Sequence, residues 1–540
     1  MGESPKVQTN NKFSKGVINL KRTKSLFLLI TALVMTVSLV YAPSAQEKGG
    51  TLTIANPADI TGLDPAFITD AATDRVADRI YNHLAAVDQE GKLQPELAKS
   101  WDVSEDLTTY TFYLREDVTF HDGTKFNAEA VKAQLDRVLD PDVASVAREQ
   151  FKKIIDSYEI LDEYTIRIKT KRPHVTFIKK FMLANPMAIP SPTAFEKYGE
   201  DFAWNPVGTG PFVFEEYEAG QHVKLSKNED YWQGAPKLDE IVYKPIPEVS
   251  TRLVELETGG VDLVYKVPLE DLDRLEKNKD IVIQKTPYPS IEGLWFQHDN
   301  YEPFGNVEVR RALAHGLDEK KIYESLLKGV AMFGNSFIPV VSWANYDTGH
   351  YKYAPEKAKS ILEEAGWTHE DGDGVREKDG KELSFTITTT PAVFIKAPEI
   401  CAVAQSQWKA IGVEAEIETL DWSAFLDKQY GKKFDMIFTG WQSGSQEPTN
   451  FAMNNVGTGG KGNAWGYSNL AVDAILQRAT EIKDREARKE LYKEAQKITH
   501  RDVVWIPIYN QIGMAAHTDK LEGYEYSAIV EDFTKAWIED

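Results

Sequence analysis

The chain has 540 residues, more than a single hydrophobic core usually organises, so two or three domains are expected. Hydrophobic residues make up 42% of it, which is enough to fill such cores. The formal net charge of −21 and the pI near 5.1 exclude a nucleic-acid-binding protein, because such proteins gather Lys and Arg on one surface.

The first 45 residues differ in composition from the rest. Basic residues at positions 21 to 24 precede the apolar run Leu26–Val40, and small residues follow it up to Ala45. This order is typical of a secretory signal peptide, which we assign to residues 1–45. A membrane anchor is the alternative, but the run is short for crossing a bilayer. Cleavage would remove six bases and one acid, and would change the formal charge from −21 to −26.

Cysteine usage supports an exported protein that is not anchored. Cys401 is the only cysteine, so the fold cannot contain an internal disulfide. No Cys stands directly after the apolar run, so a lipid anchor at that place is excluded. We therefore expect a soluble periplasmic protein.

Along the remaining chain, segments with strand-like alternation of apolar residues are followed by segments with helical spacing. This pattern is typical of α/β proteins. Gly366 and Gly412 are expected to end the helices predicted at 354–365 and 400–411. We predict strands at 51–54 and 109–114, a hairpin formed by 157–161 and 164–169, and helices at 73–84, from Asn127 onward, at 354–365 and at 400–411.

Local signatures of enzymes and metal sites are weak. The sequence contains no HExxH, GxSxG, CxxC or phosphate-binding GxxxxGK[ST] motif. Residues 457–462 match GxGxxG, but no predicted strand precedes them, so we interpret them as a loop. Residues 371–380 begin like a calcium loop, yet Val375 and Arg376 stand where a ligand and a glycine are needed. We predict a hairpin turn there, and expect no catalytic residue, no metal and no cofactor.

An ordered series of motifs is far more specific. It begins at Leu63-Asp64-Pro65 and continues through Leu93–Trp101, Asp117–Gly123 and Val207–Phe212 to Gly440-Trp441. The series resembles the extracytoplasmic solute-binding proteins of family 5, the dipeptide-, oligopeptide- and nickel-binding type that serves ABC transporters. The matches extend over roughly residues 49 to 515.

The resemblance implies an α/β, two-lobed periplasmic-binding-protein fold of type II, with the extra domain of the peptide-binding class. Two crossing strands would join the lobes, near Ser290–Phe296 and near Ile506–Gln511. The expected domains are residues 49–92 with 208–291 and 511–540 (lobe 1, domain I), residues 93–207 (lobe 1, domain II) and residues 292–510 (lobe 2, domain III).

The function implied is that of the periplasmic substrate-binding component of an ABC importer. Such a monomer would capture a peptide-like or other small polar solute by lobe closure and deliver it to permease subunits, without binding nucleic acid. A solute that touches both lobes stabilises the closed form over the open one. Two alternatives stay open: a nickel-chelate or opine-type binding protein of the same fold, and a secreted hydrolase with a carboxylate pair. Import and sensing cannot be separated by sequence.

The resemblance also implies where the solute binds. The matching family segment lines the cleft, so we expect Trp441, Gln442, Ser443 and Asn450 to face the pocket, with core packing as the alternative for Trp441. Further candidates are Thr389 and Thr390, which end an alternating run, and Trp422. Most other landmarks, such as Ala98, Phe112, Leu114 and Gly208, are explained by the scaffold alone.

One position departs from the family pattern. Peptide-binding members hold the peptide's amino group with an aspartate three residues after the Gly-Trp pair, and this position is Gly444 here. Glu447 is a candidate substitute, although an acid before the proline is frequent in the family whatever the ligand. The place at which the nickel-binding type presents an arginine, residues 185–190, has no base. These differences favour a modified or blocked peptide, or another small polar solute, over a metal chelate.

Overall fold

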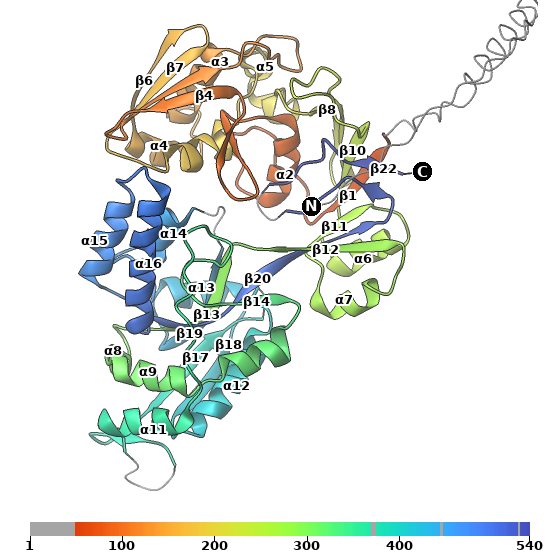
Figure 1. Cartoon of the computed structure of the whole chain (residues 1–540). Helices are drawn as coiled ribbons and strands as arrows, with labels where there is room; N and C mark the ends of the chain where they lie inside the picture. The colour runs from red at the N-terminus through yellow and green to blue at the C-terminus, as the bar shows by residue number, and fades with distance from the viewer. Residues whose placement is uncertain (1–48, 369–373, 392, 443–446, 528–529, 540) are drawn as a thin grey trace, which may run out of the picture. The chain divides into compact units, whose positions relative to one another are not determined.

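The computed structural model describes residues 49–368, 374–391, 393–442, 447–527 and 530–539. The predicted signal peptide and the first part of the predicted turn at 371–380 lie outside these residues. From Gly49 onward the chain belongs to one unit. It is a mixed α/β structure in which two lobes are joined by long strands (Figure 1). Within the described part of the chain, every helix is too short or too polar to cross a bilayer.

Twelve strands form one mixed sheet that extends into both lobes. They are β1 (Thr51–Asn56), β8 (Phe212–Glu218), β9 (His222–Lys227), β10 (Glu240–Pro245), β11 (Leu263–Tyr265), β12 (Ile281–Pro287), β13 (Ser290–Phe296), β14 (Ala331–Phe333), β17 (Ser384–Thr389), β18 (Glu414–Thr419), β19 (Met436–Gln442) and β20 (Trp505–Thr518). Their order is β18-β17-β19-β13-β20-β11-β1-β10-β9-β8, and both β12 and β14 also pair with β20.

Strand β20 belongs to both lobes. Its 14 residues pair antiparallel with β13 and β14 in the first half and with β11 and β12 in the second half. Only Tyr288 and Pro289 separate β12 from β13. The chain therefore passes between the lobes through two neighbouring strands. Residues 290–296 and 506–511, which the resemblance places at the crossings, are both strands.

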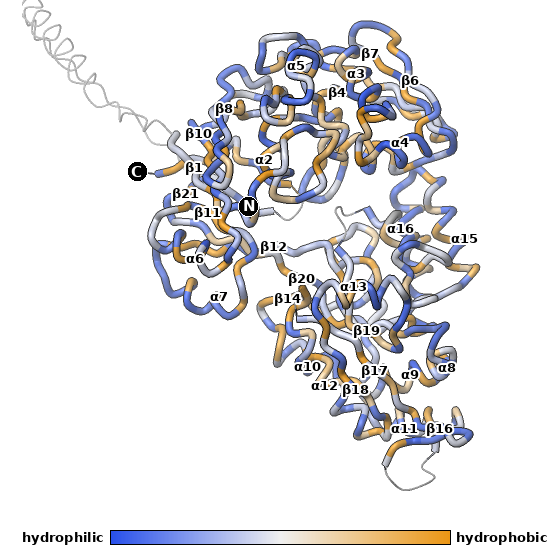
Figure 2. The backbone as a smooth tube through the Cα atoms, turned by 180° about the vertical axis from the view of Figure 1, so that it is seen from behind, coloured by the Kyte–Doolittle hydropathy of each residue, from blue (hydrophilic) through white to orange (hydrophobic). Residues whose placement is uncertain are grey.

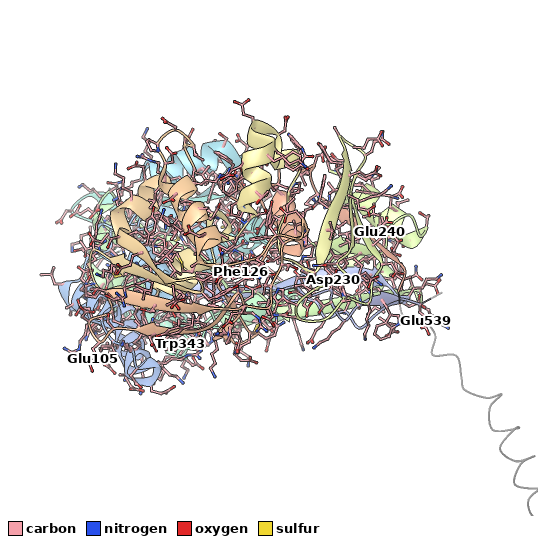
Figure 3. All side chains as sticks on the ribbon, turned by 90° about the horizontal axis from the view of Figure 1, so that it is seen from above. Glu105, Phe126, Asp230, Glu240, Trp343 and Glu539 are labelled. Atoms are coloured by element: carbon pink, nitrogen blue, oxygen red, sulfur yellow. The ribbon has the colours of Figure 1, made fainter. Side chains whose placement is uncertain are left out.

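A second sheet is built from four antiparallel strands in the order β4-β5-β7-β6. They are β4 (Ala98–Val103), β5 (Thr109–Leu114), β6 (Ile155–Asp162) and β7 (Thr165–Thr170). Tyr110, Phe112 and Leu114 are buried on one face of β5, as expected for a sheet with one solvated side. Helix α3 (Ala128–Leu139) packs into the same core, which also contains Phe126, labelled in Figure 3.

The remaining helices surround these sheets, and several begin at a side-chain cap. The carboxylate of Asp70 accepts hydrogen bonds from the backbone N–H groups of Ala72 and Thr73, and Asn127 caps α3 in the same way. The helices are α2 (Ala71–Ile80), α4 (Arg148–Ile154), α5 (Pro192–Tyr198), α6 (Val249–Glu257), α7 (Leu269–Leu275), α8 (Glu302–Gly305), α9 (Val307–His315), α10 (Glu319–Ile322), α11 (Pro355–Glu364), α12 (Ala397–Lys409), α13 (Trp422–Tyr430), α14 (Pro448–Asn455), α15 (Leu470–Ala479) and α16 (Arg485–Arg501).

Buried apolar side chains gather in separate cores. The largest lies in the second lobe, where Trp295 stacks on Trp465 and Trp505 with ring centroids 3.8 and 4.4 Å apart. The first lobe has one core under the four-stranded sheet, one around β1 and one around α6 and α7. Phe202 packs in the core around β1, although it falls within the expected domain II. Hydrophobic stretches follow the inner strands in Figure 2, and the outer helix α16 is mostly hydrophilic.

The elements predicted from sequence are confirmed. Strands 51–54 and 109–114 are β1 and β5, and the hairpin is β6–β7. The helix predicted at 73–84 ends at Ile80, and Leu84 is buried just beyond it. Gly366 and Gly412 close their helices with φ of +91° and +84°. The GxGxxG residues form turns after α14 instead of linking a strand to a helix, and β15 (Glu377–Lys378) and β16 (Lys381–Glu382) form a short hairpin.

Gly208 should be intolerant of any side chain. A Cβ added there would lie 2.1 Å from the backbone oxygen of Ile80, the last residue of α2. We expect Gly208→Ala to lower the free energy of unfolding by about 1–3 kcal/mol, since overpacking forces backbone shifts. Gly305→Ala is the control, because its Cβ would meet its nearest heavy atom only at 4.0 Å. Equal urea midpoints for the two variants would contradict the steric explanation.

Candidate ligand-binding site

The expected pocket segment begins at the end of β19, beside the strand that crosses between the lobes. Trp441 and Gln442 are the last two residues of β19, and they pair with Ile291 and Ser290 at the start of β13. Residues 436–441 are mostly apolar, as expected for a strand that lies inside the second lobe. Sheet pairing therefore holds both predicted side chains next to the crossing.

Trp441 combines core packing with an unsatisfied donor. Its ring is half-buried, packs against the core of the second lobe and lies 6.4 Å from Trp465, centroid to centroid. Its indole Nε1 is buried and has no hydrogen-bond partner among the described residues. The buried indole N–H groups of Trp295, Trp343 and Trp465 also have no partner among the described residues, so this feature does not by itself mark a ligand site. Gln442 is exposed.

The other predicted residues are spread over neighbouring elements. Thr389 and Thr390 are fully buried at the end of β17. Burial raises the pKa of the Cys401 thiol to about 12, and Thr389 opposes that shift, so Thr389 lies against α12. Trp422 opens α13, is 39% exposed and stacks on Phe425 at 5.6 Å. Ser443 and Gly444 lie outside the described residues, as does the side chain of Asn450, whose backbone is in α14. All seven positions stay predictions.

Sequence reasoning missed a buried acid at the crossing. Glu292 of β13 is fully buried and lies opposite Gly440 and Tyr509 in the sheet. The hydroxyl of Ser290 donates to its Oε2 at 3.0 Å. A Cβ at Gly440 would lie 2.5 Å from the Glu292 Cγ, so the glycine makes room for this carboxyl. The available signal was an acid within the apolar run 291–296.

Glu292 retains its proton to unusually high pH. Burial raises the pKa of this carboxyl well above its ordinary value, while the hydrogen bond from Ser290 and the nearby side-chain amide of Gln511 offset this rise only in part. The neighbouring Tyr509 carries no positive charge that would stabilise an ionised Glu292. Burial raises the pKa of Tyr509 as well. The group is therefore a hydrogen-bonding neutral acid over a pH range in which exposed glutamates are ionised.

Glu447, the candidate substitute for the missing aspartate, is already held by cations. It is buried and accepts hydrogen bonds from Arg488 and, at 2.7 Å, from the hydroxyl of Thr449. Lys179 of the first lobe lies 3.6 Å away, Nζ to Oε2. These partners neutralise the carboxylate, which favours a structural role for Glu447 over binding of a solute amine.

The lobes touch on the side of Glu447. Lys483 donates from Nζ to the backbone oxygen of Val103 at 2.8 Å, and the Val175 N–H donates to the oxygen of Thr480 at 3.4 Å. Helices α15 and α16 lie beside the four-stranded sheet and α4 in Figure 1. Glu105 and Trp343, labelled in Figure 3, lie on this same side. The described structure thus has contact between the lobes at some distance from the crossing strands.

Two surface cavities lie away from the predicted site residues. One of about 420 Å³ is lined by residues that include Arg310, Arg311 and Arg501, and one of about 450 Å³ lies over β5 and β7. Neither includes a predicted site residue. Among the described residues no cluster of three or more His, Cys, Asp or Glu could hold a metal ion.

Comparison with known proteins agrees with the fold. Residues 92–463 match the bacterial extracellular solute-binding proteins, family 5. The glutathione-binding protein GsiB of Shigella flexneri is 33% identical over 484 residues, covering 87% of this chain and 91% of that protein. The Helicobacter pylori periplasmic binding protein DppA, solved with the peptide STSA, superposes with a TM-score of 0.70 at 28% identity and covers 92% of this chain and 99% of that one. The nickel ABC transporter structure from Bacillus halodurans gives 0.77 at 28% identity, covering 91% and 100%.

The chain belongs to the bacterial extracellular solute-binding proteins of family 5. The resemblance stated from the motifs and the expected two-lobed α/β fold are both confirmed.

The buried acid predicts a pH-dependent stability. Above pH 4.5, the ordinary value, an unfolded Glu292 loses its proton, whereas the folded protein keeps it until its raised pKa is reached. Wild-type stability should therefore fall relative to Glu292→Gln as pH rises above about 4.5, by at most about 1.4 kcal/mol per pH unit. Urea unfolding of both proteins from pH 4 to pH 8 measures the difference. A constant difference would contradict the raised pKa.

Neutralising Glu447 should lower the stability of the protein and leave the solute affinity of the folded protein unchanged. Glu447→Gln leaves the buried guanidinium of Arg488 without its ionised partner, which costs about 3–5 kcal/mol. The variant should unfold at lower denaturant concentration, while the folded fraction should bind solute as wild type does. Glu490→Gln, which removes an exposed acid on the same helix as Arg488, is the control. A selective loss of solute binding without loss of stability would instead assign Glu447 to the ligand.

Proposed function

We propose that the protein is the substrate-binding component of an ABC importer and that it captures a peptide-like solute, with glutathione as the first candidate. The observation that carries the proposal is family membership together with two lobes joined by neighbouring strands. Relatives named for glutathione binding over 87% of the chain support the candidate solute. Solved relatives that bind a peptide or a nickel–histidine complex, or that belong to a nickel transporter, support the broader class.

Binding by lobe closure follows from this architecture. The lobes have separate cores, so each can move as a body while β12–β13 and β20 absorb a change in backbone angles. A solute that contacts both lobes favours the closed form by the difference between its affinities for the two forms. The proposed activity is capture and release without chemical change, so the protein is not an enzyme in this proposal.

The finer expectations belong to the same proposal. The order of basic, apolar and small residues at the N-terminus supports a signal peptide at 1–45 and a periplasmic location without a lipid anchor. The family supports a monomeric state and delivery to permease subunits. We also propose the three domains with the boundaries given above. The separate cores support the division into domains, although Phe202 packs with the core around β1. Trp441, Gln442, Ser443, Asn450, Thr389, Thr390 and Trp422 remain the proposed pocket residues of the second lobe.

Calorimetry tests this function directly. Glutathione, the dipeptide Met-Leu and a nickel–histidine complex should be titrated into the purified mature protein. We expect a peptide-like solute to bind with a micromolar or lower Kd, and mass spectrometry should recover it intact. Tighter binding of the nickel complex would favour the chelate alternative. Many turnovers of a consumed solute, or no binding of any of the three, would contradict the proposal.

A further inference from the structure

The first lobe contains an arginine whose guanidinium has no hydrogen-bond acceptor among the described residues. Arg75, in the second turn of α2, is half-buried, and its guanidinium lies 4.4 Å above the ring of Tyr265. In the described part of the chain no carboxylate or other acceptor hydrogen-bonds to this guanidinium. A half-buried arginine normally forms several charge-assisted hydrogen bonds, so its free donors point to an absent anion.

The fold places Arg75 where open α/β sheets bind ligands. Strand β1 runs parallel to β10 and β11, and the carboxyl ends of the three strands meet at Asn56, Pro245 and Tyr265. The Asn56 amide donates to the backbone oxygen of Ala72, which ties the start of α2 to that edge. Val76 and Ile80 bury the other face of the helix. The carboxyl edge of parallel strands is the usual location of a ligand in such folds.

Two tyrosines converge on the same place from different segments. Tyr288 lies between β12 and β13, and Tyr526 lies in the C-terminal segment, 6.3 Å from Tyr265, centroid to centroid. Both rings approach Gly513 of β20, where an added Cβ would lie 2.8 Å from the Tyr526 hydroxyl and 3.5 Å from the Tyr288 ring. Neither hydroxyl hydrogen-bonds to any described residue.

Arg75 is electrostatically close to both phenols. Burial raises the pKa of Tyr288 and of Tyr526, and the positive charge of Arg75 opposes the rise in each case. The nearby carboxylate of Glu531 is already used, since Tyr265 and Tyr524 donate to its Oε1 at 2.7 and 2.8 Å. Arg75, Tyr288 and Tyr526 thus offer donors that no acceptor of the described chain satisfies.

Further positive charge surrounds these donors. Lys266 follows Tyr265 in the left-handed backbone region, with φ of +57°, and is exposed. The surrounding protein still removes part of the water around its ammonium, and this desolvation lowers the pKa of Lys266, as does repulsion by Arg75 and Arg252. Among the described residues, Arg252 donates to the backbone oxygens of Ile246 and Pro247 and to no carboxylate. Glu248 lies near Arg252 and Glu531 near Tyr526, but neither acid hydrogen-bonds to Arg75 in the described part of the chain. In a chain with a net charge of −21, this group of cations is suited to an anionic ligand.

We propose that Arg75, together with the hydroxyls of Tyr288 and Tyr526, binds a carboxylate of the captured solute. A guanidinium matches a carboxylate through two parallel N–H donors, and the phenols supply further hydrogen bonds. The subsite supplies a first-lobe half to a pocket whose other candidates all lie on the second lobe. It rests on the proposed function and restricts the solute class to molecules with a free carboxylate, such as a peptide with an unblocked C-terminus.

The test compares acids with their neutral forms. Glutathione, its glycine amide and its diethyl ester, and Met-Leu with its C-terminal amide, are titrated into wild type and Arg75→Gln. We expect loss of the recognised carboxylate or of Arg75 to weaken binding by roughly 10- to 100-fold, and the two losses not to add. Wild-type affinity in Arg75→Gln, or acids and amides bound equally by wild type, would overturn the proposal.

Two matched variants guard against trivial outcomes. Arg274→Gln removes an exposed arginine of the same lobe that is paired with Glu257 and Asp271, and it should bind as wild type does. Tyr288→Phe keeps the ring and removes one donor, so it should weaken the acid severalfold and leave the amide unchanged. If Arg75→Gln fails to fold, Tyr288→Phe decides, and equal weakening of acid and amide would count against the proposal.

An acetate titration separates this proposal from the proposed function. The Nε–H resonance of Arg75, assigned by its loss in Arg75→Gln, should shift and saturate with acetate in the wild-type protein. If no peptide binds but this resonance saturates, the proposed solute class is wrong and the carboxylate subsite stands. If peptides bind and the resonance does not respond to acetate, and Arg75→Gln binds them normally, the subsite is wrong and the function stands.

Discussion

Backbone pairing along β20 is the constraint on which the structure depends. A strand inside a sheet must satisfy its N–H and C=O groups on both edges, and β20 does so in one lobe with β13 and β14 and in the other with β11 and β12. The lobes cannot separate without breaking that ladder. They can still rotate about the short segment in which the partners change, because Tyr288 and Pro289 are the only residues between β12 and β13.

This constraint concentrates unusual side chains at the crossing. Close strand approach leaves no space for a side chain at Gly293, where a Cβ would lie 2.3 Å from the Ile506 oxygen. A side chain at Gly440 would collide with the buried side chain of Glu292. Ser290 donates to that carboxyl and accepts from the Gln511 N–H at 2.9 Å, so it links the two crossing strands. Polar groups that share a buried place in this way fix the register of the strands.

Electrostatics divides the molecule into satisfied and unsatisfied regions. Where the lobes touch, Glu447 lies between Arg488 and Lys179, and its charge is balanced. At the carboxyl edge of β1 and β11, the cation of Arg75 lies over the ring of Tyr265, and no described residue accepts a hydrogen bond from it. The first arrangement explains stability without a ligand. The second is costly for an empty protein, since a partly desolvated charge gains from any anion that pairs with it.

The sequence by itself determined the family, the secondary structure and the crossing strands. Periodicity located β1, β5 and α3, because local backbone preferences and one-sided burial leave their mark on neighbouring residues. The candidate site was predicted only on the second lobe, where one continuous segment carries the motif around Trp441. Only the tertiary structure brought Arg75, Tyr288 and Tyr526 together and showed that Glu292 is buried, since these residues come from segments separated by up to 451 positions, and their proximity arises from sheet pairing that no local pattern encodes.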